Sequence, residues 1–280
     1  MTAKAVLITG CSTGIGRATA EHLAAKGHTV YATARKLEAV ADLEAKGCRT
    51  LALDVTSEES MQSAVRTVEE AEGAVGALVN NAGYSQSGAI ETIPLDSIRA
   101  QFETNVFGLI RMCQLVLPKM REQGHGRIVN ISSMGGRLSF PGGGIYHATK
   151  YSVEAISDVL RWEVQGFGVD VVLIEPGLIK THFADTAVGT VTDAEDDGVY
   201  GRFNSAVSAA TAGAYEGPLA RLGGGPETVA RAIEKAIVKR RPRTRYLVTP
   251  SARLALTQRR LVTDRTWDRL MRANFPRPGP

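Results

Sequence analysis

Short apolar runs alternate with longer segments of helical periodicity along most of the chain. Seven runs rich in Val, Ile, Leu and Thr end in turn residues, which predicts strands. They are AVLITG (5–10), HTVYAT (28–33), CRTLAL (48–53), GALVNN (76–81), GRIVNISS (126–133), GVDVVLIEPG (168–177) and TRYLVT (244–249). The runs are continuous and not alternating, which indicates strands that are covered on both faces.

Amphipathic helical patterns fill the intervals between these runs. They cover Ile15 to Lys26, Leu37 to Lys46, Glu58 to Glu72, Leu95 to Glu122, Ile145 to Phe167 and Glu227 to Lys239. Strand–helix alternation of this kind predicts an α/β fold, a doubly wound parallel sheet of the Rossmann type with helices on both faces. We predict one such domain over residues 1–250.

Residues 182–225 depart from the strand–helix pattern. They are rich in Ala, Gly and Thr and include the acidic run Asp193–Asp197. A long irregular segment after the sixth strand predicts a lid, with one or two short helices. Apolar contact with a substrate would come from Phe183, Val188, Val191, Tyr200, Phe203 and Tyr215.

The last segment, residues 251–280, reads as a basic amphipathic tail. Trp267, Leu270, Met271 and Asn274 share one helical face, and arginines flank it. This pattern favours a helix packed on the body or on a partner subunit, and a helix lying on a membrane surface is the alternative.

Charge and cysteine content narrow the class of protein. The net charge of +4 is uneven, because residues 239–280 hold twelve Lys or Arg against two Asp and the remainder is acidic. That distribution argues against a nucleic-acid-binding core. Cys11, Cys48 and Cys113 form no Cys-x-x-Cys pair, so we expect no metal site, no disulfide framework and reduced thiols.

Hydropathy at the start of the chain adds an expectation about location. The segment MTAKAVLITG lacks the apolar stretch of a signal peptide. No run approaches the ~20 apolar residues of a membrane span. We therefore expect a cytoplasmic protein.

A glycine-rich turn lies between the first strand and the first helix. Gly10, Gly14 and Gly16 let backbone amides approach a pyrophosphate, and the helix N-terminus adds partial positive charge. The spacing is not that of a P-loop, which requires a following Gly-Lys-Ser/Thr. The second strand ends in VYATARK, with Ala34 where an NAD-binding protein places an acid, followed by Arg35. A guanidinium there binds a 2′-phosphate, so we predict NADP(H), with NAD(H) as the less favoured cofactor.

Tyr146 and Lys150 are one helical turn apart, and Ser133 ends the fifth strand. A phenol has a reference pKa near 10, and a neighbouring ammonium lowers that pKa. The phenol then becomes suited to proton exchange with an alcohol oxygen, to which the serine hydroxyl also donates. His147 points away from this face and is interpreted as a residue without a catalytic role.

Several motifs occur in the order typical of one family. They are TGCSTGIG (9–16), DVT (54–56), NNAG (80–83), NVFG (105–108), YHATK (146–150) with Ser133, and EPGLIKT (175–181). Over about residues 4–250 the chain resembles the short-chain dehydrogenase/reductases of the common single-domain type. Within that family it is similar to bacterial relatives of the 17β-hydroxysteroid and retinol dehydrogenase branch.

The resemblance implies a strand order of 3-2-1-4-5-6-7 and assigns roles to residues. Catalysis would rest on Ser133, Tyr146 and Lys150, with Asn105 holding a water that relays protons to the lysine. Substrate would meet Ser133, Tyr146, His182 and Phe183. The implied cofactor residues are Gly10, Ser12, Thr13, Gly14, Ile15, Gly16, Arg35, Asp54, Val55, Asn81, Ala82, Gly83, Tyr146, Lys150, Pro176, Gly177, Ile179 and Thr181. Asp54 has an alternative interpretation as a cap of the following helix.

The implied activity is hydride transfer between NADP(H) and a ketone or secondary alcohol, and the branch implies a bulky, hydrophobic substrate that is steroid- or retinoid-like. Two alternatives remain: a 3-oxoacyl-thioester reductase, and a non-catalytic NADP(H)-binding regulator. The resemblance also implies a homodimer or homotetramer, assembled through the helices that begin near Leu95 and Ile145.

Overall fold

A computed structural model describes residues 5–181, 183–191, 198–216, 218–273 and 275–278. Seven parallel strands form one sheet in the order β3-β2-β1-β4-β5-β6-β7, which confirms the predicted topology. The strands are β1 Ala5–Ile8, β2 Thr29–Ala34, β3 Arg49–Ala52, β4 Ala77–Asn80, β5 Gly126–Ile131, β6 Val169–Glu175 and β7 Arg245–Leu247.

Eleven helical segments accompany the sheet in the described part of the chain. They are α1 Gly14–Ala25, α2 Glu58–Glu72, α3 Leu95–Phe102, a π-helical turn at Glu103–Phe107, α4 Gly108–Glu122, α5 Gly144–Val164, α6 Phe183–Gly189, α7 Gly201–Glu216, α8 Pro226–Val238, α9 Pro250–Leu261 and α10 Asp264–Arg272. Short 3₁₀ helices span Leu37–Ala39, Ala41–Lys46, Met134–Gly136, Gln165–Phe167 and Pro218–Leu222.

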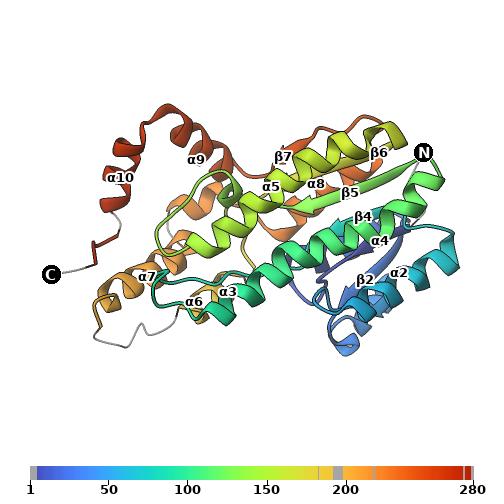
Figure 1. The fold of residues 1–280 in the computed structure, drawn as a ribbon, viewed down its shortest axis with the longest axis horizontal. Helices are drawn as coiled ribbons and strands as arrows, with labels where there is room; N and C mark the ends of the chain where they lie inside the picture. The colour runs from blue at the N-terminus through green and yellow to red at the C-terminus, as the bar shows by residue number, and fades with distance from the viewer. Residues whose placement is uncertain (1–4, 182, 192–197, 217, 274, 279–280) are drawn as a thin grey trace.

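Helices cover both faces of the sheet, as the continuous apolar strands require. Along β1, Ala5 and Leu7 face the core beneath α2, α4 and α5, while Val6 and Ile8 face the core beneath α1 and α8. Figure 1 shows α4 and α5 crossing one face. Because successive side chains of a strand point to opposite faces, a strand buried on both sides is apolar at successive positions, as β1 is from Ala5 to Ile8.

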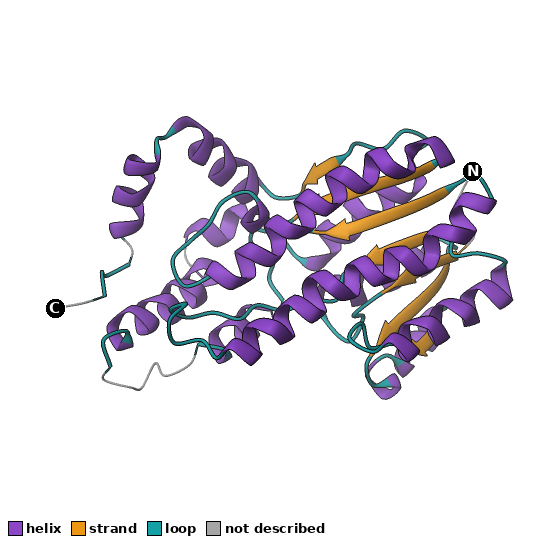
Figure 2. Cartoon of the chain, viewed as in Figure 1, coloured by secondary structure: helices purple, strands orange, loops and turns teal. Residues whose placement is uncertain are grey.

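A largely helical region extends beyond the carboxyl ends of the strands. Figure 2 shows the strands gathered at one end of the molecule and α6, α7, α9 and α10 at the other. The predicted lid of residues 182–225 therefore holds more regular structure than expected, since α7 alone has 16 residues. His182 and the acidic run Asp193–Asp197 lie outside the described residues.

Two predicted helices differ from the structure. The segment Leu37 to Lys46 forms two 3₁₀ helices separated at Val40, whose φ of −130° interrupts the helix. This bend lets both Val40 and Leu43 enter the core beneath α1. The segment Leu95 to Glu122 is interrupted by the π-helical turn at Glu103–Phe107, where Asn105 and Val106 are buried.

The tail forms two helices and not one. α9 begins at Pro250, with Thr249 as its N-cap, so the boundary predicted between residues 250 and 251 falls in its first turn. In α10, Trp267 is buried and its indole nitrogen donates to the carbonyl oxygen of Ser139 at 3.4 Å. The tail therefore packs on the body, which its amphipathic pattern favoured over a position on a membrane surface.

No described helix has both the length and the apolar character needed to cross a membrane. The three cysteines are all buried, and burial raises the pKa of the Cys11 and Cys113 thiols to about 12.

Candidate active site

A cavity of about 920 Å³ opens at the carboxyl ends of the strands, on both sides of the point where β1 separates β2 from β4. Ligands of doubly wound sheets bind at such a switch point. Every cofactor residue predicted above lines this cavity except Gly16. The predicted catalytic residues Ser133, Tyr146 and Lys150 line it too, as does Phe183.

The glycine loop has a backbone conformation that lets a ligand approach its amides closely. Gly10 and Gly14 have φ of 73° and 60°, values that side chains other than glycine rarely adopt. A Cβ on Gly16 would overlap the carbonyl oxygen of Gly10, so Gly16 lets α1 pack against the loop and does not itself face the cavity. The side-chain amide of Asn81 donates to the carbonyl oxygens of Thr9 and Gly10, each at 2.9 Å, and holds the loop against β4.

The N-terminus of α1 faces this loop. Its N-cap Thr13 makes no side-chain hydrogen bond to the first turn, and that turn contains no acidic residue. The first amides of the helix are thus left for an anionic ligand, which is the arrangement that binds a phosphate. Residues of the loop and the cavity volume therefore fit a dinucleotide.

Arg35 follows β2 and lines the same cavity. Within the described part of the chain, no carboxylate lies within 4.0 Å of its guanidinium. Asp54, after β3, also lines the cavity, and its Oδ1 accepts from the backbone and side chain of Thr56 at 2.9 and 2.8 Å. Ser57 is the N-cap of α2, so the capping role considered for Asp54 belongs to another residue.

Tyr146 and Lys150 project from α5 toward the cavity. The ammonium nitrogen of Lys150 lies 5.8 Å from the centroid of the Tyr146 ring and donates to the carbonyl oxygen of Ile131 at 2.8 Å. Burial lowers the pKa of Lys150 to about 8, and the carboxylate of Glu154 opposes that change. Ser133 Oγ accepts from the amide of Gly135 at 3.0 Å, an arrangement that leaves its hydroxyl hydrogen free to donate.

Asn105 lies behind the cavity and not in its lining. Its Nδ2 donates to the carbonyl oxygen of Tyr84 at 2.9 Å and to Thr149 Oγ1 at 3.1 Å, and its Oδ1 accepts from the Tyr84 amide at 3.1 Å. The side chain thereby joins the segment after β4 to the helix that carries Tyr146. The π-helical turn around Asn105 matches the tendency of such turns to occur at functional sites.

His147 lies at the site, although its position on the helix suggested that it points away from the face of Tyr146 and Lys150. It is buried and lines the cavity, and its Nδ1 lies 3.0 Å from the carbonyl oxygen of Gly135. Because a carbonyl only accepts, Nδ1 carries the proton. Burial lowers the pKa of His147 to about 4, so the ring is neutral and fixes the loop that follows Ser133.

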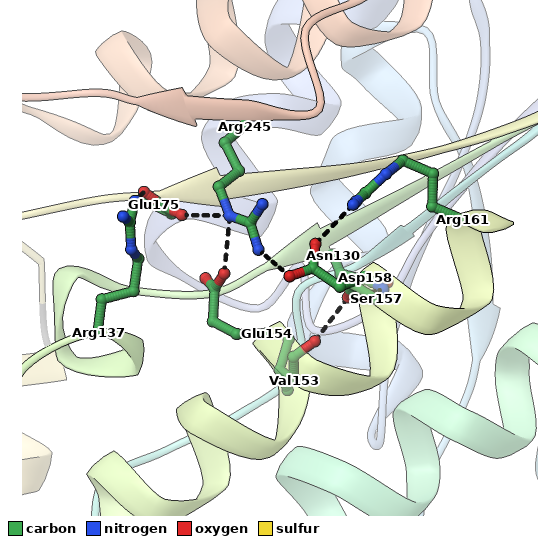
Figure 3. Close-up of polar contacts among 9 residues, drawn as sticks. All are labelled: Asn130, Arg137, Val153, Glu154, Ser157, Asp158, Arg161, Glu175 and Arg245. Atoms are coloured by element: carbon green, nitrogen blue, oxygen red, sulfur yellow. Dashed lines mark hydrogen bonds and ion pairs between the residues drawn. The ribbon is translucent and has the colours of Figure 1, made fainter.

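A cluster of charged residues links β6, β7 and α5 (Figure 3). Glu175, the last residue of β6, is fully buried, and its carboxylate lies 3.1 Å from Arg245 Nε of β7 and 3.3 Å from Arg137. Arg245 also contacts Glu154 at 3.1 Å and Asp158 at 2.5 Å on α5. The cluster therefore connects the segment after Ser133, the helix of Tyr146 and the strand that leads into Pro176.

Sequence reasoning missed this cluster and a second cavity. The signal for the cluster was Glu175, a glutamate that directly follows the apolar run Val171–Ile174. The second cavity, of about 650 Å³, is lined in part by α7, α9 and α10. The residues that it shares with the first cavity are Met134, Phe140, Tyr146, His147, Leu178 and Phe183. The signal for it was the apolar face of the tail around Trp267.

Comparison with known proteins is consistent with this geometry. The sequence model of the family described as short chain dehydrogenase matches residues 4–190. An Escherichia coli K12 protein described as uncharacterized oxidoreductase YbbO is 35% identical over 271 residues, which are 96% of this chain and 94% of that protein.

Two further proteins carry a cofactor in their descriptions. The NADPH-dependent 3-dehydrocapnine reductase of Ornithobacterium rhinotracheale is 33% identical over 276 residues, with 94% of each chain covered. The solved structure of the closed form of serine dehydrogenase complexed with NADP+ has a TM-score of 0.75 and 27% identity, and the match covers 88% of this chain and 94% of that one.

Proposed function

The chain belongs to the short chain dehydrogenase family, and on that premise we propose that it transfers a hydride between NADP(H) and an apolar ketone or secondary alcohol. One observation carries the proposal. Tyr146, with the ammonium of Lys150 5.8 Å from its ring centroid, stands where the cavity behind the glycine loop meets the second cavity. A bound dinucleotide and a carbonyl compound would meet at that hydroxyl.

The chain's own residues handle the proton. The nicotinamide supplies or accepts the hydride when it is bound. Tyr146 donates its hydroxyl proton to the carbonyl oxygen during reduction, and Ser133 donates a second hydrogen bond to the same oxygen. Lys150 stabilises the resulting phenolate, since an ammonium favours the charged form of a neighbouring phenol. Asn105 holds the segment after β4 against α5. We include in the proposal that Asn105 also takes part in a proton relay to Lys150.

Arg35 supports the choice of NADP(H). Its guanidinium comes directly after Ala34, which stands at the end of β2 where an NAD-binding protein places the carboxylate that binds the ribose. A charge-assisted contact with a 2′-phosphate contributes about 1.5–3 kcal/mol. The names of the similar reductase and of the solved complex support the same cofactor, one mentioning NADPH and the other NADP+.

The proposed substrate is bulky and apolar, of steroid or retinoid size, because the second cavity is built largely from apolar side chains. We include in the proposal a homodimer or homotetramer and a cytoplasmic location, the latter in keeping with three unpaired thiols.

A panel of carbonyl compounds and alcohols with both cofactors tests the proposal. We expect NADPH oxidation with apolar ketones at a rate at least tenfold above that with acetoacetyl thioesters. Faster turnover of the thioesters favours a 3-oxoacyl-thioester reductase. Tight NADPH binding with no turnover of any compound favours a non-catalytic regulator.

A further inference from the structure

The second cavity lies between α7, α9, α10 and the loop before α5, and we call it the distal chamber. Its walls include Val207, Ala210 and Ala214 of α7, Leu254 of α9, and Trp267 and Met271 of α10. Its volume of about 650 Å³ lies within the range of sites that enclose a drug-sized molecule. Tyr146 stands at its inner end, so a molecule that reacts there would extend into the chamber.

The distal chamber has no charged residue among its described lining side chains. The cofactor cavity differs, because Arg35, Asp54, Glu103 and Lys150 line it. Burying a charge without a partner costs far more than burying an apolar group gains. The chamber therefore selects for the uncharged and apolar part of a molecule, and the charged groups of any ligand belong elsewhere.

A row of aromatic contacts connects the tail to Tyr146. The Trp267 and Phe140 rings lie 5.9 Å apart, Phe140 and His147 also 5.9 Å, and His147 and Tyr146 5.7 Å. The indole nitrogen of Trp267 donates to the backbone just before Phe140, and Arg259 lies over the outer face of its ring at 5.5 Å. These contacts fix α10 as a wall of the chamber at a defined position relative to Tyr146.

Small side chains on α7 keep the chamber open on the opposite side. Ala210, Gly213 and Ala214 face it, whereas Ala209 and Ala212 of the same helix are exposed and lie outside the lining. α7 itself is held close to the body, because a Cβ on Gly142 would overlap the side chain of Val207. The space is therefore a property of the residue sizes on one helix face.

Just over half of the residues that line the chamber lie beyond the family match, which ends at residue 190. From these observations we infer that the tail helices α9 and α10 form the far wall of the substrate site and that the site accepts a ketone with a long, uncharged, apolar arm. The carbonyl lies at Tyr146 and the arm extends toward Trp267. This inference rests on the proposed function and names the part of the chain that sets its specificity.

Chain-length dependence is the first test. The wild-type protein is assayed with NADPH and the 2-alkanones from 2-butanone to 2-tetradecanone, with a steroid ketone as a rigid arm of similar bulk. We expect kcat/KM to rise by about fourfold for each methylene that enters the chamber and then to level off. A steroid ketone that is reduced as fast as the best alkanone supports the inference, and one that is reduced no faster than 2-butanone contradicts it. A flat series would overturn the inference.

Space-filling and charge-inserting variants are the second test. Ala210→Phe fills the chamber, and its matched control Ala209→Phe adds the same ring at the adjacent exposed position. Met271→Glu places a carboxylate in the chamber, and Arg272→Glu places it on the next, outward residue. We expect each chamber variant to lower the ratio of kcat/KM for 2-tetradecanone to that for 2-butanone by at least about tenfold. Equal ratios in variant and control contradict the role of the chamber.

Fluorescence separates this inference from the proposed function. The chain has two tryptophans, so Trp162→Phe leaves Trp267 as the reporter. With NADPH absent, saturable quenching of Trp267 by 2-tetradecanone, lost in Met271→Glu and kept in Arg272→Glu, supports the chamber even if no ketone is reduced. Turnover of small ketones without any saturable change in Trp267 supports the proposed function and refutes the chamber.

Discussion

The Nε atom of Arg245 lies 3.1 Å from the carboxylate of Glu175, which joins the last strand of the sheet to the residue before Pro176. Glu175 is fully buried, with Glu154 as its acidic neighbour. Burial first, and the nearby charge of Glu154 second, raise the pKa of Glu175 to about 7. The ion pairs with Arg245 and Arg137 act in the opposite direction without cancelling the effect.

A carboxyl group with a raised pKa in the folded state gives a defined pH dependence of stability. The folded protein keeps a proton on Glu175 that the unfolded chain releases at a lower pH. The stabilisation is therefore complete below the ordinary carboxyl pKa and is lost as the pH rises through about 7. We expect the urea midpoint of Glu175→Gln, relative to wild type, to increase between about pH 5 and about pH 8. Asp170→Asn, at a half-exposed carboxylate on the same strand, is the control, and parallel curves for Glu175→Gln and wild type would contradict the assignment.

Lys150 governs a second pH dependence, that of the reaction. Burial lowers the pKa of Lys150 to about 8, so the ammonium that stabilises the Tyr146 phenolate is lost as the pH rises through that value. We expect kcat/KM for ketone reduction to fall above about pH 8. In Lys150→Arg the rate is lower, but the falling limb moves to higher pH because a guanidinium keeps its proton. If the falling limb of the pH profile stays near pH 8 in Lys150→Arg, a group other than Lys150 causes it.

Tyr146 can be tested without disturbing the cofactor cavity. Tyr146→Phe removes only the hydroxyl, so we expect NADPH to bind with a Kd within about twofold of wild type while turnover falls by at least the roughly hundredfold typical of lost acid–base catalysis. Tyr151→Phe, at an exposed tyrosine on the same helix, is the control and keeps full activity. Retention of more than a tenth of the wild-type rate in Tyr146→Phe would falsify its role as the proton donor.

Arg35 determines cofactor preference in our proposal. Arg35→Ala removes the guanidinium that would bind the 2′-phosphate, and we expect kcat/KM for NADPH to fall roughly tenfold to a hundredfold while that for NADH changes little. Lys36→Ala removes a charge at the next residue, which is exposed and outside the lining of the cavity. A wild-type preference for NADH, or equal losses with both cofactors in Arg35→Ala, contradicts this interpretation.

The sheet was predictable from the sequence because the apolar pattern of a strand reflects how its two faces are buried. β1 is apolar at Ala5 through Ile8 since both faces are covered, and the apolar positions of the central strands β4, β5 and β6 follow the same rule. The edge strands β3 and β7 are less buried and hold polar residues. Motif spacing placed Tyr146, Lys150 and the glycine loop for a related reason, because helical period and loop length are local properties.

Features that depend on distant contacts were not predictable in the same way. The π-helical turn at Asn105 adds a residue that no periodicity marks, and the Asn105 side chain donates a hydrogen bond to Thr149 on another helix. The apolar face of α10 indicated packing, but nothing near Trp267 in the sequence identifies Ser139, 128 residues earlier, as its partner. Val40 likewise interrupts a predicted helix in order to reach the core.

Assembly gives the last prediction, on the side of α5 that faces away from the sheet. Trp162 and Val159 are 72% and 57% exposed, and Tyr151 lies exposed on the same helix. Contiguous exposed apolar side chains of this size mark contact surfaces, and a helix that packs on its own copy makes a symmetric interface. We expect wild-type protein to sediment as a dimer or tetramer and Trp162→Glu to sediment as a smaller species. Leu261→Glu, at an exposed leucine of α9, changes the surface charge equally and leaves the assembly intact. A carboxylate buried at the centre of this interface would have no partner, so Trp162→Glu must weaken an assembly formed through it. An unchanged sedimentation coefficient for Trp162→Glu therefore excludes this face of α5 as the interface.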